Sequence, residues 1–437
     1  MILKQLGTLS IGFVISLANL LPAHTQVQAA PGDDHADLKY VVYVTRHGVR
    51  SPTGKVSQYS QYSTAPWPAW DVAPGYLTAH GFQLMQIFGS YDRLLLHDEG
   101  LLPASGCEAA NQVTIYADSD ERTRETGRAL AAGLLPGCNV TVAGLPEGEN
   151  DPLFHPPASS ISATAWAEAA IAGRIGNDPS AISEAYRSKL LELDNVLGSC
   201  GAHTGTAPSR TSIVDIPASL TPGSGDHAAD LHGPLNTAST LTEILLLEYA
   251  QGMPANDVGW GCVDGRKVRS LIDLHTAASD LTQRTPAVAA LQASNLLRTI
   301  ANSMKQAVTR QAVPHVPGRT ADRALLLVGH DTNLSNLAGL LDINWLEDGR
   351  RDDTPPGSTL VFELWQSQRT KEFSVRLFFM AQTLEQMRNS TVLSMQNPPQ
   401  RVPVFVPGCS RADFSCSWDA FSQTVSRSID EGSLKAR

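Results

Sequence analysis

Past residue 30, the sequence lacks any apolar run approaching the roughly 18 residues that a membrane-spanning helix needs. It also lacks internal repeats and low-complexity segments, which excludes solenoid and fibrous proteins. Basic residues are in the minority, because 33 Lys and Arg stand against 43 Asp and Glu, for a formal net charge of −10. This balance argues against a binder of nucleic acid or anionic membranes, so an anionic small molecule would need a local cluster of arginines.

The beginning of the chain is arranged like a cleaved secretory signal, which we place at residues 1–30. A lysine precedes an apolar stretch from Leu6 to Leu21, and small residues follow at Ala29 and Ala30, where we place the cleavage. The alternative is a membrane anchor, but polar residues interrupt the apolar stretch, which is short for a span. We therefore expect a periplasmic or secreted protein with no stable membrane anchor.

The six cysteines include no Cys-x-x-Cys pair and no tight cluster with histidine, so we predict no metal site. An even number of cysteines in an exported chain is typical of disulfide bonds. Nearest neighbours along the chain suggest two pairs, and the third follows by elimination only. The expected disulfides are Cys107–Cys138, Cys409–Cys416 and, by elimination, Cys200–Cys262.

With 437 residues, of which 42% are hydrophobic and 17% charged, the chain can bury a sizeable core. Three apolar runs are typical of buried parallel strands, and each leads directly into polar residues. They are Leu38–Val44, Val113–Ala117 and Ala324–Val328. The second run is followed by the acidic segment Asp118–Glu125 and then by a helical pattern. Strand, loop and helix in this order predict an α/β sheet.

Between about residues 163 and 301, the sequence has helical patterns and little strand signal. The clearest helical segments are Ile182–Leu197, Ala238–Ala250 and Val268–Thr282. A stretch rich in Gly, Pro, Ser and Asp, residues 201–234, indicates a long irregular connection, which is a surface loop or a lid; we favour the loop.

We therefore predict one α/β core interrupted by a helical insertion. The core consists of residues 31–155 and 302–437, and the smaller, mainly α-helical domain consists of residues 156–301.

Residues 46–52 read Arg-His-Gly-Val-Arg-Ser-Pro and follow the first predicted strand directly. The motif places His47 between Arg46 and Arg50 at a strand end, where open α/β sheets bind ligands. Two guanidinium groups can bind phosphate oxygens in a bidentate way, and a neutral imidazole between them can attack phosphorus. Gly48 would let the backbone approach the anion closely. The alternative is a solvated basic turn, but the fixed spacing of five residue types favours a phosphate site.

A second histidine and a carboxyl group follow the third predicted strand, in the sequence Gly-His-Asp-Thr-Asn-Leu. His330 can hydrogen-bond a phosphate oxygen, and Asp331 can hold the proton that a departing alkoxide needs. Alone, Gly-His-Asp is more often a turn with an Asp cap. Together with the first motif in one exported α/β chain, it indicates a catalytic pair.

Arg122 is a candidate for a third guanidinium, because it begins a helix whose N-terminal dipole also favours an anion. Arg124 and Arg128 compete for this role, and each of the three could instead form a salt bridge on the helix surface. Spacing alone does not choose between them.

The motifs resemble the Arg-His-Gly-x-Arg-x-Pro and His-Asp signatures of the histidine acid phosphatases, most closely the bacterial periplasmic phytases and glucose-1-phosphatases. The resemblance covers nearly all of the mature chain. Further stretches that look like the phytase branch are Leu241–Ile244, Gln251–Pro254, Gln283–Pro286 and Asp353–Gly357. The resemblance implies a phosphoglycerate-mutase-like α/β core sheet flanked by helices, a smaller helical domain, and an active site between them.

The resemblance also implies a role for each matching residue and selects Arg122 among the three arginines. It makes His47 the nucleophile and Asp331 the proton donor, and it assigns phosphate binding to Arg46, Arg50, Arg122 and His330. The implied reaction is a two-step displacement at phosphorus through a covalent phosphohistidine, without metal or cofactor. An acid optimum is expected, because the donor must keep its proton.

The expected substrate is a small phosphomonoester, either phytate or a sugar phosphate. Possible pocket residues are Thr53, Lys55, Glu243 and Thr332, although Glu243 could equally be a solvated helix carboxylate. The chain departs from the phytase pattern at Lys55, which follows a glycine, and at Gln292 and Ala278, where phytases look more polar or basic. These departures bear on the substrate, so a glucose-1-phosphatase or broad sugar-phosphate phosphatase is the alternative.

Three other classes fit less well. An inactive phosphate-ester-binding protein would lose the nucleophile or the acid, but His47 and Asp331 are both present. A phosphoglycerate-mutase-like enzyme shares the Arg-His-Gly chemistry, but export and six cysteines disfavour a cytosolic role. A disulfide-rich adhesin would explain export but not the motifs. We expect a monomer.

Overall fold

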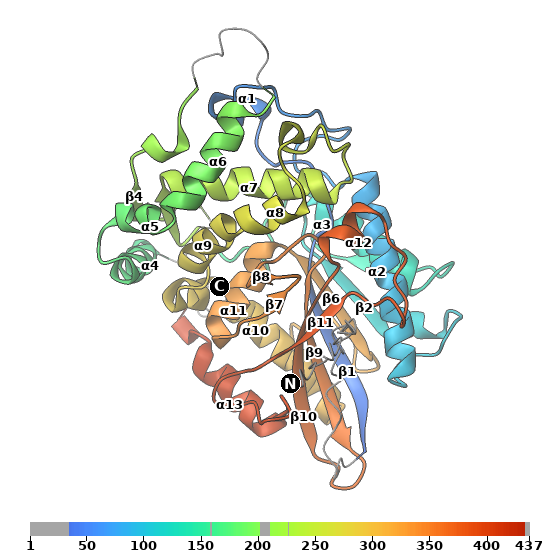
Figure 1. Cartoon of the computed structure of the whole chain (residues 1–437). Coiled ribbons are helices and arrows are strands. Elements are labelled where there is room, and N and C mark those ends of the chain that lie inside the picture. Colours follow the sequence, from blue (N-terminus) through green and yellow to red (C-terminus); the bar gives the residue numbers. More distant parts are fainter. Residues whose placement is uncertain (1–34, 158–159, 202–209, 226, 433–437) are drawn as a thin grey trace, which may run out of the picture.

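A mixed β-sheet lies at the centre of the computed structural model, which describes residues 35–157, 160–201, 210–225 and 227–432 (Figure 1). The predicted signal segment lies outside these residues. Along the sheet the strands are β11 (Gln400–Val404), β10 (Phe373–Ala381), β9 (Thr359–Ser367), β1 (Ala36–Arg46), β6 (Ala324–Gly329), β2 (Val113–Ala117) and β3 (Val142–Ala143), with β12 (Cys416–Ser417) paired to β10. This arrangement confirms the predicted α/β class.

The three predicted strands are β1, β6 and β2, and β6 lies between the other two and parallel to both. In the register of β1 with β6, Arg46 is opposite Gly329. The next residue of each chain segment is a histidine, so His47 and His330 leave the sheet side by side. The two sequence motifs meet because the carboxyl ends of adjacent parallel strands lie at the same edge.

Helices cover both faces of the sheet (Figure 1). One face packs against α2 (Ala79–Asp98) and α3 (Glu121–Leu134), and the other packs against α10 (Pro286–Thr309), α11 (Asp331–Leu341) and α13 (Trp418–Ser428). Along β1, Val41 and Tyr43 face the first group, whereas Val42 and Val44 face the second. Because both faces are buried, the strand is apolar throughout rather than alternating.

A further set of helices shares its own hydrophobic cluster beside the sheet (Figure 1). It consists of α4 (Ile161–Arg174), α5 (Pro179–Ala185), α6 (Arg187–Ser199), α7 (Pro234–Ala250), α8 (Gly265–Leu271) and α9 (Asp273–Thr282). Two predicted helices are each divided, at Tyr186 and at Ile272, and the third begins earlier than expected, at Pro234. The predicted domain boundaries stay a prediction, and the one after residue 301 falls inside α10.

The connection over residues 201–234 is less irregular than its composition suggests. Outside the undescribed residues 202–209 and 226, it contains a two-stranded ribbon, β4 (Ser219–Pro222) with β5 (Ala229–His232). The short remaining elements are α1 (Val56–Tyr59), α12 (Leu384–Arg388), β7 (Leu346–Glu347), β8 (Arg350–Arg351) and the 3-10 turns η1 (Ser60–Tyr62), η2 (Glu108–Asn111), η3 (Ile213–Asp215) and η4 (Val258–Gly261).

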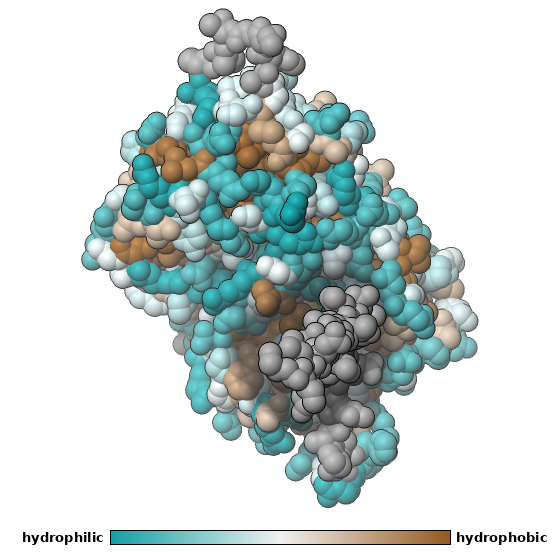
Figure 2. Space-filling model, viewed as in Figure 1, coloured by the Kyte–Doolittle hydropathy of each residue, from teal (hydrophilic) through white to brown (hydrophobic). Residues whose placement is uncertain are grey.

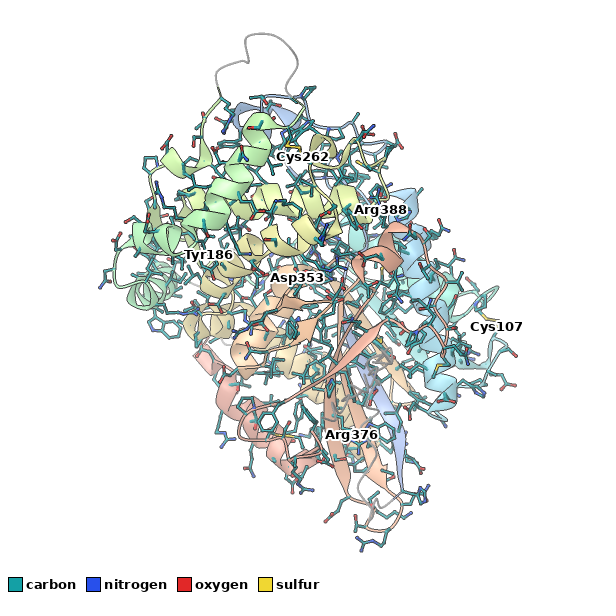
Figure 3. The ribbon with its side chains drawn as sticks, viewed as in Figure 1. Cys107, Tyr186, Cys262, Asp353, Arg376 and Arg388 are labelled. Carbon is teal, nitrogen blue, oxygen red and sulfur yellow. A yellow bond between two sulfur atoms is a disulfide. The ribbon has the colours of Figure 1, made fainter. Side chains whose placement is uncertain are left out.

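The structure contains the three disulfides expected from the sequence, so all six cysteines are paired. Cys107 lies beyond the end of α2, and Cys262 lies at the upper end of the helical layer (Figure 3). The face of the molecule in Figure 2 is mostly hydrophilic, with small hydrophobic patches. In the described part of the chain, no helix combines the length and the apolar character needed to cross a membrane.

Candidate active site

His47 follows β1 directly, and its side chain is buried. Its Nδ1 lies 2.9 Å from the carbonyl oxygen of Gly48. A carbonyl can only accept, so Nδ1 carries the proton and the neutral ring keeps its lone pair on Nε2. Burial, and then the nearby charges of Arg122, Arg50 and Arg46, hold the pKa of His47 well below its usual range. The ring is therefore a neutral base whose reactive nitrogen is defined by the backbone.

The turn that carries His47 is held against α2 and α3. The backbone N–H of Gly48 donates to Thr126 Oγ1 at 2.9 Å. A Cβ atom on Gly48 would lie 2.8 Å from Met85 Cγ and 3.1 Å from the carbonyl oxygen of Gly81. The glycine is therefore required by close packing on α2, whereas the sequence had suggested close approach to an anion.

Arg46 and Arg50 are both buried, and both point at one carboxylate. Nη2 of Arg46 donates to Oε1 of Glu243, and Nη2 of Arg50 lies 3.1 Å from the same oxygen. Burial raises the pKa of Glu243, but Arg50 and Arg46 more than offset this and hold it below its usual range. Glu243 therefore enters the site from α7 as a charged ligand of the two arginines, and not as a solvated helix carboxylate.

Arg122 is the arginine of α3 that reaches the site. Its Nη2 lies 3.4 Å from Nδ1 of His330. Arg124 instead donates to the backbone oxygen of Leu145, and Arg128 pairs with a glutamate on the helix surface. The geometry thus separates three candidates that spacing could not distinguish.

His330 is held by a carboxylate that follows β2. Its Nε2 lies 2.6 Å from Oδ2 of Asp118, and the same oxygen accepts a hydrogen bond from Nε2 of His155 at 2.9 Å. Burial raises the pKa of Asp118, but the hydrogen bonds from the two histidines lower it far more. Burial, and then Arg122 and His155, lower the pKa of His330, although its hydrogen bond to Asp118 raises it. The proton of the neutral ring is on Nε2, so Nδ1 can donate to a ligand only when a bound anion brings a second proton to the ring.

Four groups at this point have the spacing of metal ligands. Potential ligand atoms of Asp118, Asp120, His155 and His330 lie within 4.8 Å of one another. The sequence did not indicate this cluster, because His155 and His330 come from segments far from the one that holds Asp118 and Asp120. Hydrogen bonds between Asp118 and the two histidines, and an ion pair of 2.5 Å between Asp120 and Arg122, account for the arrangement without an ion.

Asp331 is the first residue of α11, and its Oδ1 accepts the backbone N–H of Thr332 at 2.8 Å. Its Oδ2 lies 3.4 Å from Nη2 of Arg46 and 3.9 Å from Nε2 of His275. Burial raises the pKa of Asp331, but Arg46, then His275 and Arg50, hold it well below its usual range. Asp331 is therefore ionised while the arginines carry no phosphate, and an anion bound to them would raise its pKa again.

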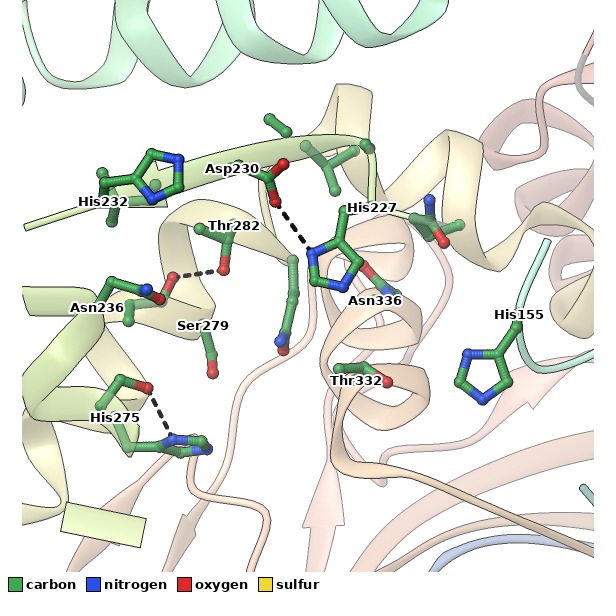
Figure 4. Close-up of a pocket in the computed structure, with 18 of the residues that line it drawn as sticks. His155, His227, Asp230, His232, Asn236, His275, Ser279, Thr282, Thr332 and Asn336 are labelled. Atoms are coloured by element: carbon green, nitrogen blue, oxygen red, sulfur yellow. Dashed lines mark hydrogen bonds and ion pairs between the residues drawn. The ribbon is translucent and has the colours of Figure 1, made fainter. Parts of the chain in front are cut away.

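A cavity of about 340 Å³ lies beside Asp331, bounded by β5, α7, α9, α10 and α11 (Figure 4). Thr332 lines it, and so do Gln292 and Ala278, two positions at which the sequence departs from the phytase pattern. Lys55 does not line this cavity; it is exposed and precedes α1. Thr53 is also exposed, and both Thr53 and Arg122 lie next to Gly75.

Sequence reasoning missed Asp118, His155 and His275. Asp118 could have been found, because it follows a predicted strand just as His47 and His330 do. The two histidines carry no local signal, since each stands among unrelated residues and meets the site only through the fold.

The sequence pattern of the histidine phosphatase superfamily (branch 2) matches residues 37–193 and 219–380. The chain belongs to this family. It is 38% identical over 426 residues to Phytase AppA of Escherichia coli K12, which covers 94% of this chain and 96% of AppA. It is 28% identical over 415 residues to a glucose-1-phosphatase of Providencia rettgeri, covering 92% and 95%.

Among solved structures, the Hafnia alvei phytase in complex with myo-inositol hexakis sulphate is similar, with a TM-score of 0.81 and 32% identity. The match covers 93% of this chain and 99% of that one. The chain is thus a histidine acid phosphatase, a phosphomonoesterase of the phytase-like type.

Proposed function

We propose that this histidine acid phosphatase hydrolyses phytate and other phosphomonoesters through a phosphohistidine at His47. One observation carries the proposal: the backbone fixes the proton of buried, neutral His47 on Nδ1, which leaves Nε2 as the nucleophile beside three arginines. Arg46, Arg50 and Arg122 would hold the non-bridging oxygens. The negative charge of the bound phosphate would raise the lowered pKa of His330, so that its Nδ1 can donate to a phosphate oxygen.

In the first step, Nε2 of His47 attacks phosphorus in line, and the bond from phosphorus to the ester oxygen breaks. The leaving oxygen takes a proton from Asp331. That proton is on Asp331 because the phosphate group offsets the charge of the arginines, which otherwise keep the carboxyl ionised. The alcohol leaves as a neutral molecule, so the leaving oxygen must receive a proton. In acid solution that proton enters the complex with the phosphate ester or on Asp331, so the step is favoured there.

In the second step, water attacks the phosphohistidine, and the bond from phosphorus to nitrogen breaks. Asp331 accepts the proton of the water, and His47 returns as the neutral ring with its proton on Nδ1. Arginines supply the positive charge that a metal ion supplies in other phosphoryl-transfer enzymes, so we expect full activity without added metal.

The size of the cavity and the resemblance to two phytases support phytate as substrate. The cavity beside Asp331 has room for ring substituents that do not react. A second candidate is a sugar-phosphate phosphatase, which is favoured because no lysine or arginine occurs among the described residues that line the cavity.

The decisive assay measures inorganic phosphate released at acid pH, without metal, from phytate, glucose 1-phosphate and p-nitrophenyl phosphate. Wild type is compared with His47→Ala and with His97→Ala, a histidine at the end of α2 outside the site. Loss of phytase activity in His47→Ala alone supports the proposal. Activity on the smaller esters only establishes the sugar-phosphate alternative, and no release from any ester would indicate a binding protein.

The proposal includes export, supported by three disulfides and by the signal-like beginning of the sequence. We expect the secreted protein to begin at or just after Ala30, as N-terminal sequencing would reveal, and to elute as a monomer in size-exclusion chromatography.

A further inference from the structure

Histidines supply the basic side chains of the cavity beside Asp331. Four imidazoles line it: His227 and His232 from the ribbon that contains β5, and His155 and His275 from two other segments (Figure 4). The described residues that line it include no lysine and no arginine, and a single carboxylate, Asp230. A cavity for a polyanion would ordinarily carry fixed cations, so its composition here is unusual for the proposed substrate.

Imidazoles ordinarily gain or lose their charge between pH 5 and 8, unlike lysine and arginine. The charge of this cavity therefore depends on pH. A protonated imidazole can donate a charge-assisted hydrogen bond to a phosphate oxygen, whereas a neutral imidazole donates only an uncharged one. The carboxylate of Asp230 lies 3.1 Å from Nδ1 of His227, so when the imidazoles are neutral the described lining has no cation to offset it. The cavity then repels a polyanion.

His275 connects the cavity to the reacting atoms. It is buried on α9, and its Nδ1 lies 3.0 Å from the hydroxyl oxygen of Ser239. Its Nε2 has no hydrogen-bond partner and lies 3.9 Å from Oδ2 of Asp331. A buried ring nitrogen without a partner costs free energy, which a substrate oxygen bound there would recover.

Other charges near these histidines are directed elsewhere. The elements packed against β5 are β4, α4, α7 and α9. Their remaining charged side chains do not line the cavity; these are Glu168, Arg174, Glu243, Glu248, Asp273 and Asp280. The basic residues of α8 and β8, which pack against α9, form ion pairs with acidic residues outside the cavity. The histidines, Asp230 and Asp331 therefore set the charge that a ligand meets.

We propose that these histidines form a proton-dependent subsite for the non-reacting phosphates of a polyphosphorylated ester. In acid the enzyme accepts polyphosphorylated substrates, and toward neutral pH its preference shifts to monophosphates. The inference rests on the proposed function, because the subsite serves an ester whose reacting phosphate is held at His47.

The test uses myo-inositol hexakis sulphate as an inhibitor of p-nitrophenyl phosphate hydrolysis. Sulfate esters keep their charge in this pH range, so a change in its inhibition constant reports titration of the protein. Inorganic sulfate, a single anion for the arginine site, is measured in parallel. The ratio of the two inhibition constants removes titrations of the reacting centre. In wild type, we expect the advantage of the hexasulfate over sulfate to fall by about tenfold or more from acid to neutral pH.

Two double variants decide the outcome. His227→Gln with His232→Gln is expected to weaken hexasulfate inhibition in acid and to flatten the pH dependence of the ratio. His227→Arg with His232→Arg is expected to keep strong inhibition at neutral pH, because guanidinium stays charged. His97→Gln serves as the control histidine. An unchanged pH dependence in both double variants would overturn the inference.

The two proposals fail in different ways. If wild type hydrolyses p-nitrophenyl phosphate but never phytate, the proposed substrate is wrong, and the inhibitor ratio still reports on the subsite. If phytate is hydrolysed while the ratio ignores the histidine substitutions, only the subsite is wrong.

Discussion

His47 and His330 form their hydrogen bonds to the protein through different ring nitrogens, and this difference suits the different roles proposed for them. His47 donates its Nδ1 proton to a backbone carbonyl, which is neutral and leaves Nε2 free to attack. His330 donates from Nε2 to Asp118, although burial and Arg122 hold the pKa of His330 below its usual value. Two histidines from adjacent strands thus suit a nucleophile and a phosphate ligand.

Replacing Asp331 by Asn tests its role as proton donor. We expect kcat/KM for glycerol 2-phosphate to fall by about 10²–10⁴, because its alkoxide cannot leave without a proton. The loss for p-nitrophenyl phosphate should be much smaller, since nitrophenolate leaves as an anion. Steady-state rates with both esters provide the comparison, and equal losses would contradict the assignment.

Glu243 occupies the two arginines that the phosphate group would bind. Glu243→Gln keeps the shape and removes the competing charge, so we expect inorganic phosphate to inhibit about tenfold more strongly. The inhibition constant is measured against p-nitrophenyl phosphate, with the exposed Glu184→Gln as control. Weaker inhibition by phosphate would show that Glu243 supports anion binding.

Many residues of the candidate site could be predicted from the sequence, because they are neighbours along the chain. His47, Arg46 and Arg50 share one short motif, and His330 and Asp331 share another. The choice of Arg122 over its neighbours needed the resemblance to a family, because the helix turn that aims it has no separate sequence signal. His155 and His275 could not be predicted, since only tertiary packing brings them to the site.

At the scale of elements, the strands were predicted better than the helices. Strand β6 and most of β1 are buried on both faces, and β2 has one buried and one half-buried face, so apolar runs mark all three. The break between α5 and α6 falls at Tyr186, where no glycine or proline indicates the end of a helix. The ribbon β4–β5 lies in a segment whose composition favours turns. Its role as a cavity wall could not be inferred from that composition.

Helix α7 contains a buried acid, Glu248, that should make stability depend on pH. Burial raises the pKa of Glu248 to about 8, above its ordinary value, while Oε2 accepts the backbone N–H of Gly259. The folded protein therefore binds this proton more tightly than the unfolded chain. The stability from this group is complete in acid, below the ordinary pKa of a glutamate, and is lost as pH rises toward 8.

Glu248→Gln removes this titration. We expect the free energy of unfolding of the variant to increase relative to that of wild type as pH rises from acid, by about 3 kcal/mol near pH 7. Thermal or urea unfolding across this range measures the difference, and exposed Glu149→Gln is the matched control. A difference that is independent of pH would show that Glu248 is already ionised in the folded state.

At the scale of the whole molecule, the site lies where the sheet meets the helical layer. The sheet edge provides His47, while α7 and α9 provide Glu243 and His275. Activity therefore requires the sheet and the helical layer to keep their relative positions. The order of strands and helices along the chain made this architecture predictable, whereas contacts between the layers depend on side-chain packing that no short motif encodes.

The disulfides close loops of very different length, 62 residues for Cys200–Cys262 and 7 for Cys409–Cys416. Loop-closure entropy predicts losses of about 4 and about 2 kcal/mol when each pair is replaced by alanine. Urea unfolding of the two double variants shows which disulfide contributes more to the free energy of unfolding. A larger loss for the short loop would show that native packing, and not chain entropy, dominates.

The central claim is a covalent phosphoenzyme at His47, and rapid trapping tests it directly. The enzyme is mixed with p-nitrophenyl phosphate in acid and quenched within milliseconds into alkaline denaturant, which preserves phosphohistidine, and the labelled peptide is identified by mass spectrometry. We predict one phosphate on the peptide that contains His47, and none in His47→Ala. Turnover of wild type without phosphate on His47, or label on another residue in both proteins, would contradict the account.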